Sequence, residues 1–211
     1  MRRRQVNFAA LRRVWRRLAR PCGLAFCCWL AAITALAEPT GFSNEAELSM
    51  AVQFPLILKI LQFDRNLASR AGSEIVIAAV YQGRYHASAR ARDEMLEMAE
   101  TSTRQRVADL PVRVVDIDLE HVQLEEALDS LGVDVLYVTP LRATDIARIT
   151  RVTRERHIVS VTGVEEYVRQ GVAVGLGVWR EKPRVLVNLD ASRAEGVDFS
   201  SSLLSLAQLV K

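Results

Sequence analysis

The sequence predicts an α/β fold, a single-domain sandwich in which a largely parallel sheet is flanked by helices and finishes in a C-terminal antiparallel hairpin. Two observations lead to this prediction. Through the middle of the chain, short apolar and β-branched runs alternate with charged, amphipathic segments, which is the pattern of consecutive strand–helix–strand units. Later, two apolar runs follow each other directly across a short polar turn, as the two strands of a hairpin do.

The domain is expected over residues 44–211, and a helix is expected to open it. Asn44 followed by Glu47 is a helix-start signal, and apolar residues beyond it return on one helical face as far as Leu61. Pro55 lies within this segment. Because proline has no backbone N–H and its ring collides with the preceding turn, a kink or a break is expected there.

The strands are expected where the chain is apolar and β-branched. Residues 74–81 form an almost continuous run of this kind, which is typical of a strand buried on both faces of a parallel sheet. Further strands are predicted at residues 112–117, 133–138 and 158–161, and hairpin strands at 172–179 and 184–189. The helices between them are predicted at residues 88–106, 124–131, 143–156 and 164–169.

A last helix is expected from about Ser200 to the end of the chain. Its apolar stripe would place Leu203, Leu204 and Leu206 in the core. The serines at 200–202 are interpreted as its N-cap, because a hydroxyl oxygen accepts hydrogen bonds from the free amides of a helix start. Nothing in the sequence marks a general base that would make one of them a nucleophile.

The first 37 residues predict export from the cytoplasm. Eight arginines and no acidic residue precede or flank an apolar run over residues 22–37, which ends in Ala35-Leu36-Ala37. A basic start, a short apolar stretch and a small-x-small site make a cleaved secretory signal peptide. The run of 16 residues falls short of the roughly 20 that a membrane span needs, so an uncleaved anchor is the weaker alternative. Cleavage is expected after Ala37, with a linker at residues 38–43 and a periplasmic mature protein.

Removing the signal changes the charge of the protein. The mature chain has 20 basic and 25 acidic residues, a net charge of −5, so the basic balance of the whole chain is no argument for nucleic-acid binding. Cys22, Cys27 and Cys28 all lie within the signal. The mature protein therefore has no disulfide, no thiol nucleophile and no thiolate metal ligand.

No catalytic motif is present. The sequence has no Gly-x-Ser-x-Gly elbow, no Walker loop and no His-Glu-x-x-His pair. His86, His121 and His157 are scattered over unrelated segments, so no catalytic or metal role is assigned to them. The prediction is a protein that is not an enzyme and carries no cofactor.

A ligand or partner could contact the carboxyl ends of the parallel strands. Arg84 and Tyr85 follow the first strand, and Thr139 and Thr162 follow the third and fourth. Ligands of open α/β sheets bind at this edge, although ordinary loop chemistry is the simpler interpretation. A row of arginines on the helix at 143–156 is interpreted as a solvated face, with an acidic partner as the sharper alternative: Arg148, Arg151, Arg154 and Arg156.

The last third of the chain resembles the C-terminal signature of the YfiR/HmsC family. The residues that carry the resemblance run Val-Leu-Val-Asn-Leu-Asp-Ala at 185–191, Gly-Val-Asp-Phe-Ser-Ser at 196–201 and Leu-Leu-x-Leu-Ala at 203–207. The positions that match the family's motifs are Lys59, Gly171, Asn188, Gly196, Ser200, Ser201, Leu203 and Leu204. The chain departs from the pattern at Gln170, which replaces the first of two glycines, at Gly163, where many members carry Asp, and in its lack of mature cysteines.

The resemblance implies a periplasmic regulator without catalysis. Family members repress an inner-membrane diguanylate cyclase by holding its periplasmic sensing domain inactive, which lowers cyclic-di-GMP and biofilm output. The implied partner is therefore the periplasmic domain of such a cyclase or of a related sensor kinase, with a homodimer as a further option. The alternative is a periplasmic small-molecule binding protein that feeds a sensor or a transporter. Asn188 is then expected to bond a neighbouring loop, and Ser200 and Ser201 to cap the last helix.

The export signal gives the first testable prediction. Protein isolated from the native periplasm should begin at Glu38, because the small-x-small site ends at Ala37. N-terminal sequencing or intact mass measures this directly. A mature mass that retains residues 2–37 would contradict the periplasmic assignment.

Overall fold

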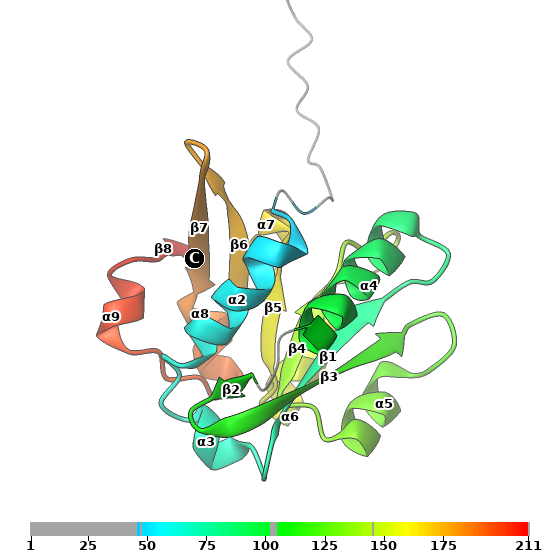
Figure 1. The fold of residues 1–211 in the computed structure, drawn as a ribbon, viewed down its shortest axis with the longest axis horizontal. Helices are drawn as coiled ribbons and strands as arrows, with labels where there is room; N and C mark the ends of the chain where they lie inside the picture. The colour runs from blue at the N-terminus through cyan, green and yellow to red at the C-terminus, as the bar shows by residue number, and fades with distance from the viewer. Residues whose placement is uncertain (1–45, 47, 102–104, 145, 211) are drawn as a thin grey trace, which may run out of the picture. The chain divides into compact units, whose positions relative to one another are not determined.

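The computed structural model describes residues 46, 48–101, 105–144 and 146–210 (Figure 1). The signal peptide, the linker and the expected helix-start residues Asn44 and Glu47 lie outside these described residues. The strands are β1 (Ile75–Tyr81), β2 (Arg106–Val107), β3 (Leu110–Asp118), β4 (Val135–Val138), β5 (Val159–Thr162), β6 (Val174–Trp179), β7 (Lys182–Asn188) and β8 (Gln208–Val210). The helices are α2 (Met50–Leu61), α3 (Leu67–Arg70), α4 (His86–Thr101), α5 (Leu124–Leu131), α6 (Ile146–Arg156), α7 (Glu165–Arg169), α8 (Leu189–Ala194) and α9 (Ser201–Leu204).

The described strands form one eight-stranded sheet in the order β2-β3-β1-β4-β5-β6-β7-β8. The strands from β3 to β6 run parallel, with β1 lying between β3 and β4. β6 and β7 form the expected antiparallel pair, and positive φ angles at Arg180 and Glu181 turn the chain between them. The predicted fold class, α/β with a largely parallel sheet and a C-terminal hairpin, is confirmed.

β1 divides the core into two layers. All seven of its residues are buried. Ile75, Ile77 and Ala79 join the cluster that contains Phe54 of α2 and Met95 of α4, whereas the alternate residues of β1 join the cluster of α5 and α6. Because successive side chains of a strand point to opposite faces, one uninterrupted apolar run supports helices on both sides of the sheet.

The helix α2 runs through Pro55 without a break, so the expected break is not observed. Pro55 lies on the exposed side of α2, while Phe54 and Ile57 are 1% exposed. Burial of a large apolar side chain stabilises a protein by about 1.5–3 kcal/mol. Several such side chains on the inner face of α2 offset the cost of one proline in its interior.

The prediction of a C-terminal helix from Ser200 to the end of the chain is wrong. Only Ser201–Leu204 is helical, as α9, and the last described residues form the edge strand β8 parallel to β7. Leu203 is buried, Leu204 is half-buried and Leu206 is 81% exposed, so the prediction of Leu206 in the core is also wrong. The physical reason is the open edge of β7: its main-chain groups bond β8, a gain that an isolated terminal helix does not offer.

The shortest helices and strands were not predicted from the sequence. Leu189, predicted as the last residue of a strand, instead opens the helix α8, which was not predicted. The helix α3 and the strand β2, also not predicted, have four and two residues. No hydrophobic period can be detected over so few positions.

Leu203 and Leu206 make a matched pair for a stability measurement. Leu203→Ala should lower the free energy of unfolding by about 2–5 kcal/mol, because it leaves a cavity beneath α9. Leu206→Ala should change it by less than about 0.5 kcal/mol, because that side chain already faces water. Urea unfolding of both variants decides the matter, and equal effects would contradict the described C-terminal structure.

Candidate functional site

The carboxyl ends of β1, β4 and β5 meet at one edge of the sheet. The chain after β1 turns toward β3 by way of α4, and the chain after β3 returns across β1 to reach β4. Loops therefore diverge between β1 and β4, which is the position where open α/β sheets leave a crevice. All four residues predicted as ligand or partner contacts lie at this edge.

Thr139 and Thr162 are buried rather than presented to a ligand. Both are 0% exposed. The Thr139 hydroxyl lies 2.6 Å from Ser88 Oγ and donates to the Val80 carbonyl at 2.9 Å. The Thr162 hydroxyl donates to the Val138 carbonyl and accepts from the Val164 amide. The two threonines therefore fasten neighbouring strand ends to one another.

Arg84 and Gly83 are held through their main chain. The Arg84 amide donates to Glu120 Oε2 at 2.9 Å, and the Gly83 amide donates to Asp118 Oδ1. The other Asp118 oxygen is 2.8 Å from His121 Nδ1. Burial by itself would raise the pKa of Asp118, but hydrogen bonds from Glu120, His121 and Gly83 lower it overall. The Arg84 side chain stays exposed at this turn.

Gln82 organises the other half of the edge. Its side-chain oxygen accepts from the Arg142 amide at 2.7 Å, and its nitrogen donates to the Arg142 carbonyl and to Thr144 Oγ1. Arg142 in turn places its guanidinium 4.2 Å from the ring centroid of Tyr85. The glutamine was not among the predicted contacts, although its position directly after a buried strand is a usable signal.

A cavity of about 290 Å³ opens beside Gln82. It lies between the loops that follow β1, β3 and β4 and is lined in part by Val122, Thr144 and Arg148. Arg148 also donates to Glu125, at 3.1 Å. Two other arginines of α6 also have partners within the protein. Arg156 donates two hydrogen bonds to Asp129, and Arg154 donates to the Gly171 carbonyl.

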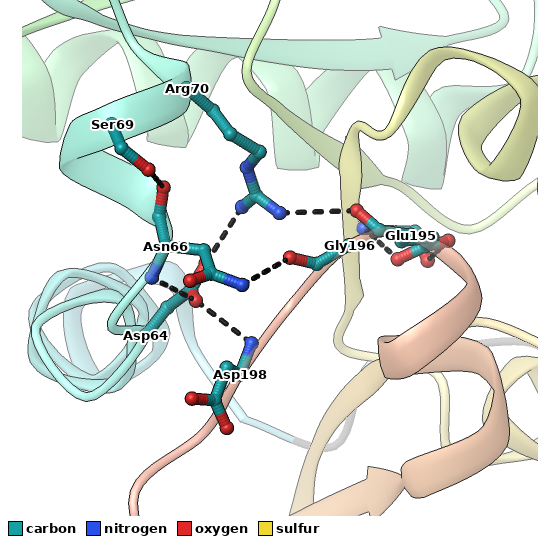
Figure 2. A network of polar contacts seen from close by, with 8 residues as sticks. Asp64, Asn66, Ser69, Arg70, Glu195, Gly196 and Asp198 are labelled. Atoms are coloured by element: carbon teal, nitrogen blue, oxygen red, sulfur yellow. Dashed lines mark hydrogen bonds and ion pairs between the residues drawn. The ribbon is translucent and has the colours of Figure 1, made fainter.

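A second polar assembly joins the corner between α2 and α3 to the segment after α8 (Figure 2). Asp64 is its centre: the carboxylate accepts from the amides of Asn66 and Asp198 and from Arg70 at 2.7 Å. Arg70 also donates to the Glu195 carbonyl, and Asn66 donates to the Gly196 carbonyl. Residues distant in sequence are therefore fixed to each other by a buried carboxylate.

Among the family-motif positions, Gly196 belongs to this assembly, while the others lie elsewhere in the fold. Gly171 and Gly196 have φ angles of 106° and 78°, values that a residue with a Cβ rarely adopts. The Asn188 side chain donates to the Val168 carbonyl and accepts from the Ala191 amide, which caps α8. Lys59, by contrast, is exposed on α2, with its amine 5.6 Å from the Phe63 ring.

The expected serine cap of the last helix is not formed by a side chain. Ser200 occupies the N-cap position of α9, but its buried hydroxyl has no hydrogen-bond partner among the described residues. Its backbone amide instead donates to the Phe63 carbonyl at 3.0 Å. Ser201 is exposed in the first turn. The serine run therefore marks a main-chain junction with the α2–α3 corner.

Three large apolar side chains are exposed on or beside the last strands. Trp179 at the end of β6 and Leu206 before β8 are 58% and 81% exposed, and Leu209 within β8 is 49% exposed. Arg184 on β7 lies 5.4 Å from the Trp179 ring centroid and 2.9 Å from Gln208 Oε1, whereas Leu209, the neighbour of Gln208 in β8, points to the other face of the sheet. We call Trp179, Leu206 and Leu209 the apolar edge. β8 also ends the sheet, so its outer main-chain groups have no described strand beside them.

Within the part of the chain that the structure describes, no cluster of His, Cys, Asp and Glu could hold a metal ion. The described helices include none with the length and apolar character to cross a membrane.

The Asp64 assembly gives a prediction about stability. Asp64→Ala should lower the free energy of unfolding by about 3 kcal/mol, because Arg70 and two amides lose a buried acceptor. Arg65→Ala removes the exposed contact of Arg65 with Asp198 and should cost less than about 1 kcal/mol. Urea titrations of both variants test this, and an Asp64 variant as stable as the Arg65 variant would show that the assembly is dispensable.

Solved structures resemble this fold at low sequence identity. A conserved domain protein from Vibrio cholerae matches with a TM-score of 0.53 and 13% identity, over 78% of this chain and 61% of that one. A ligand-free, open substrate-binding protein with adhesive properties from Clostridium difficile gives 0.49 and 19%, over 69% and 57%. An ABC domain in complex with L-tryptophan from Streptococcus pneumoniae gives 0.49 and 13%, over 72% and 62%. The chain thus spans about six-tenths of each of these proteins, and the likeness concerns the fold alone.

No curated protein matches the sequence significantly. The sequence model of the YfiR/HmsC-like family, in contrast, matches residues 51–208. The match covers α2 through the start of β8 and includes every motif position quoted above. The chain therefore belongs to the YfiR/HmsC-like family, a family of periplasmic regulators.

Proposed function

We propose that the protein binds the periplasmic sensing domain of an inner-membrane diguanylate cyclase, or of a related sensor, and holds it inactive. Cyclic-di-GMP and biofilm formation would fall as a result. The protein would act from the periplasm, after cleavage of its signal peptide, and without catalysis of its own.

The family match over residues 51–208 is the observation that carries this proposal. The geometry agrees with a binding role in two respects. The threonines at the carboxyl edge are consumed in internal hydrogen bonds, so they offer little to a substrate. Large apolar side chains instead remain in water at the apolar edge, where a partner could cover them.

We infer that the sensing domain docks on this edge of the sheet, where Trp179 and Leu206 are exposed. Trp179 is an aromatic residue flanked by Arg180 and Arg184, whose guanidinium groups lie 5.7 Å and 5.4 Å from its ring. Aromatic and arginine side chains are the types that dominate the energy of protein interfaces. To repress, this surface must bind the inactive state of the sensing domain more tightly than the active state, because only a difference in affinity shifts the equilibrium.

The alternative is a small-molecule binding protein, and the cavity of about 290 Å³ beside Gln82 favours it. The cavity has both apolar and charged lining, from Val122 and Arg148 among others. In that case the protein would pass a ligand signal to a sensor or a transporter. The two functions place the decisive residues on different parts of the molecule, so variants can separate them.

Deletion of the gene should raise cellular cyclic-di-GMP, and the rise should vanish when the cognate membrane cyclase is deleted as well. The variant Leu206→Asp should fail to complement the deletion. It should also bind the sensing domain at least about tenfold more weakly, because a charge replaces an apolar contact. Val52→Asp, at an exposed apolar position on α2, is the matched control and should complement.

Other outcomes would count against the proposal. If Leu206→Asp represses normally and Val122→Trp, which fills the cavity, does not, the small-molecule function gains support. A version without residues 2–37 that still represses from the cytoplasm would overturn the periplasmic mode of action.

A further inference from the structure

Glu195 is a fully buried carboxyl group that nothing in the proposed function requires. It follows α8 and is 0% exposed. Its side chain crosses from the C-terminal segment to two other elements: Oε1 lies 2.6 Å from Thr153 Oγ1 of α6 and 2.6 Å from Ser160 Oγ of β5. Oε2 accepts from the Ser160 amide at 2.8 Å. One carboxyl group thus joins α8, α6 and β5.

The hydrogen-bond pattern around Glu195 is complete only if the carboxyl carries a proton. The Thr153 hydroxyl has a single hydrogen but two acceptors, the Thr150 carbonyl at 3.0 Å and Glu195 Oε1 at 2.6 Å. If Glu195 is ionised, one of these contacts joins two acceptors. If Oε1 is protonated, it donates to Thr153, and Thr153 donates to Thr150. Ser160 Oγ then donates to Glu195 and accepts from the Ala173 amide.

Few charges are placed to stabilise an ionised Glu195. From α6, Arg154 lowers the pKa of Glu195 through its positive charge, but its guanidinium is engaged with the Gly171 carbonyl. From α3, Arg70 contacts the backbone carbonyl of Glu195 and pairs with Asp64. His157, after α6, faces the next residue, Gly196. From β5, the Ser160 amide and hydroxyl face the carboxyl, and the Ala173 amide before β6 donates to that hydroxyl; all three groups are uncharged.

We propose that Glu195 is a proton-operated latch: as a neutral acid it holds the C-terminal segment against α6 and β5, and loss of its proton above neutral pH loosens that segment. The latch does not depend on the identity of any partner. The stability of a periplasmic protein would then respond to the pH of its own compartment.

The sign of the effect follows from linkage. Burial raises the pKa of Glu195 to about 7, from an ordinary value of 4.5, against the opposing effect of its hydrogen bonds with Ser160 and Thr153. The folded protein therefore binds this proton more tightly than the unfolded chain does. The stabilisation is full at low pH and is lost as the pH rises from about 4.5 to about 7.

The experiment compares unfolding of the wild type and Glu195→Gln as a function of pH. In the wild type, the unfolding equilibrium constant should rise on the order of one hundredfold between about pH 5 and about pH 8. Glutamine keeps the shape of the neutral acid and cannot ionise, so the variant should lose this rise. Hydrogen exchange at the Ser160 and Ala173 amides should accelerate with pH in the wild type more than in the variant, because these amides belong to the latch.

Two controls isolate the carboxyl. Glu97→Gln removes the same charge from an exposed position on α4 and should leave the rise intact. His157→Asn removes the nearby imidazole while tolerating the positive φ of 53° at that position, and should also leave it intact. A rise that persists in Glu195→Gln, or that disappears in His157→Asn, would overturn the proposal.

A measurement on the wild type guards against a Glu195 variant that fails to fold. In ¹³C NMR of protein labelled at glutamate, one carboxyl signal should titrate near neutral pH, well above the exposed glutamates. If every glutamate carboxyl in the folded protein is ionised by about pH 5.5, the latch does not exist, because an unperturbed glutamate titrates near 4.3.

Discussion

The junction at residues 195–198 is the constraint on which much of the structure depends. There the chain, having completed the sheet as far as β7 and the helix α8, meets the corner between α2 and α3, formed more than a hundred residues earlier. Asp64 and Arg70 bind the main chain of Glu195 and Asp198, while the Glu195 side chain reaches inward to α6 and β5. Both carboxyl groups are buried, so each must be paired or protonated, and their partners come from every layer of the fold. Besides this junction, the Ser200 amide, which donates to the Phe63 carbonyl, links the same two segments.

This junction gives a structural role to two of the family-motif positions, Gly196 and Ser200. Gly196 allows the left-handed turn that brings Asp198 beneath Asp64, and Ser200 presents its amide to the Phe63 carbonyl. Asn188 serves the same region by capping α8 and bonding the end of α7. These motif residues act mainly through backbone geometry and internal hydrogen bonds. They stabilise the part of the fold that carries the apolar edge.

Polar and apolar side chains are distributed differently over the two ends of the sheet. Catalytic α/β proteins expose convergent polar groups at the carboxyl edge. Here most polar side chains at that edge are hydrogen-bonded within the protein. Gln82, Thr139 and Thr162 bond to neighbouring backbone or loops. Exposed large apolar groups lie instead beside the last strands, where β8 leaves one side of the sheet without a described neighbour. A surface of this kind is suited to binding another protein, which is the activity that a regulator needs.

The sequence by itself determined the α/β class, the four central parallel strands and the hairpin, because a strand buried on both faces must be almost wholly apolar and an amphipathic helix must repeat its apolar residues every three or four positions. It also carried the family motifs. Tertiary structure decided the rest. Residues 208–210 have the apolar character of a helix stripe but become a strand, since the edge of β7 supplies hydrogen bonds that no local pattern records. Gln82, Asp64 and Glu195 are ordinary polar residues in the sequence. They become organising groups only because segments far apart in the chain surround them, and burial then gives each hydrogen bond a weight that it lacks in water.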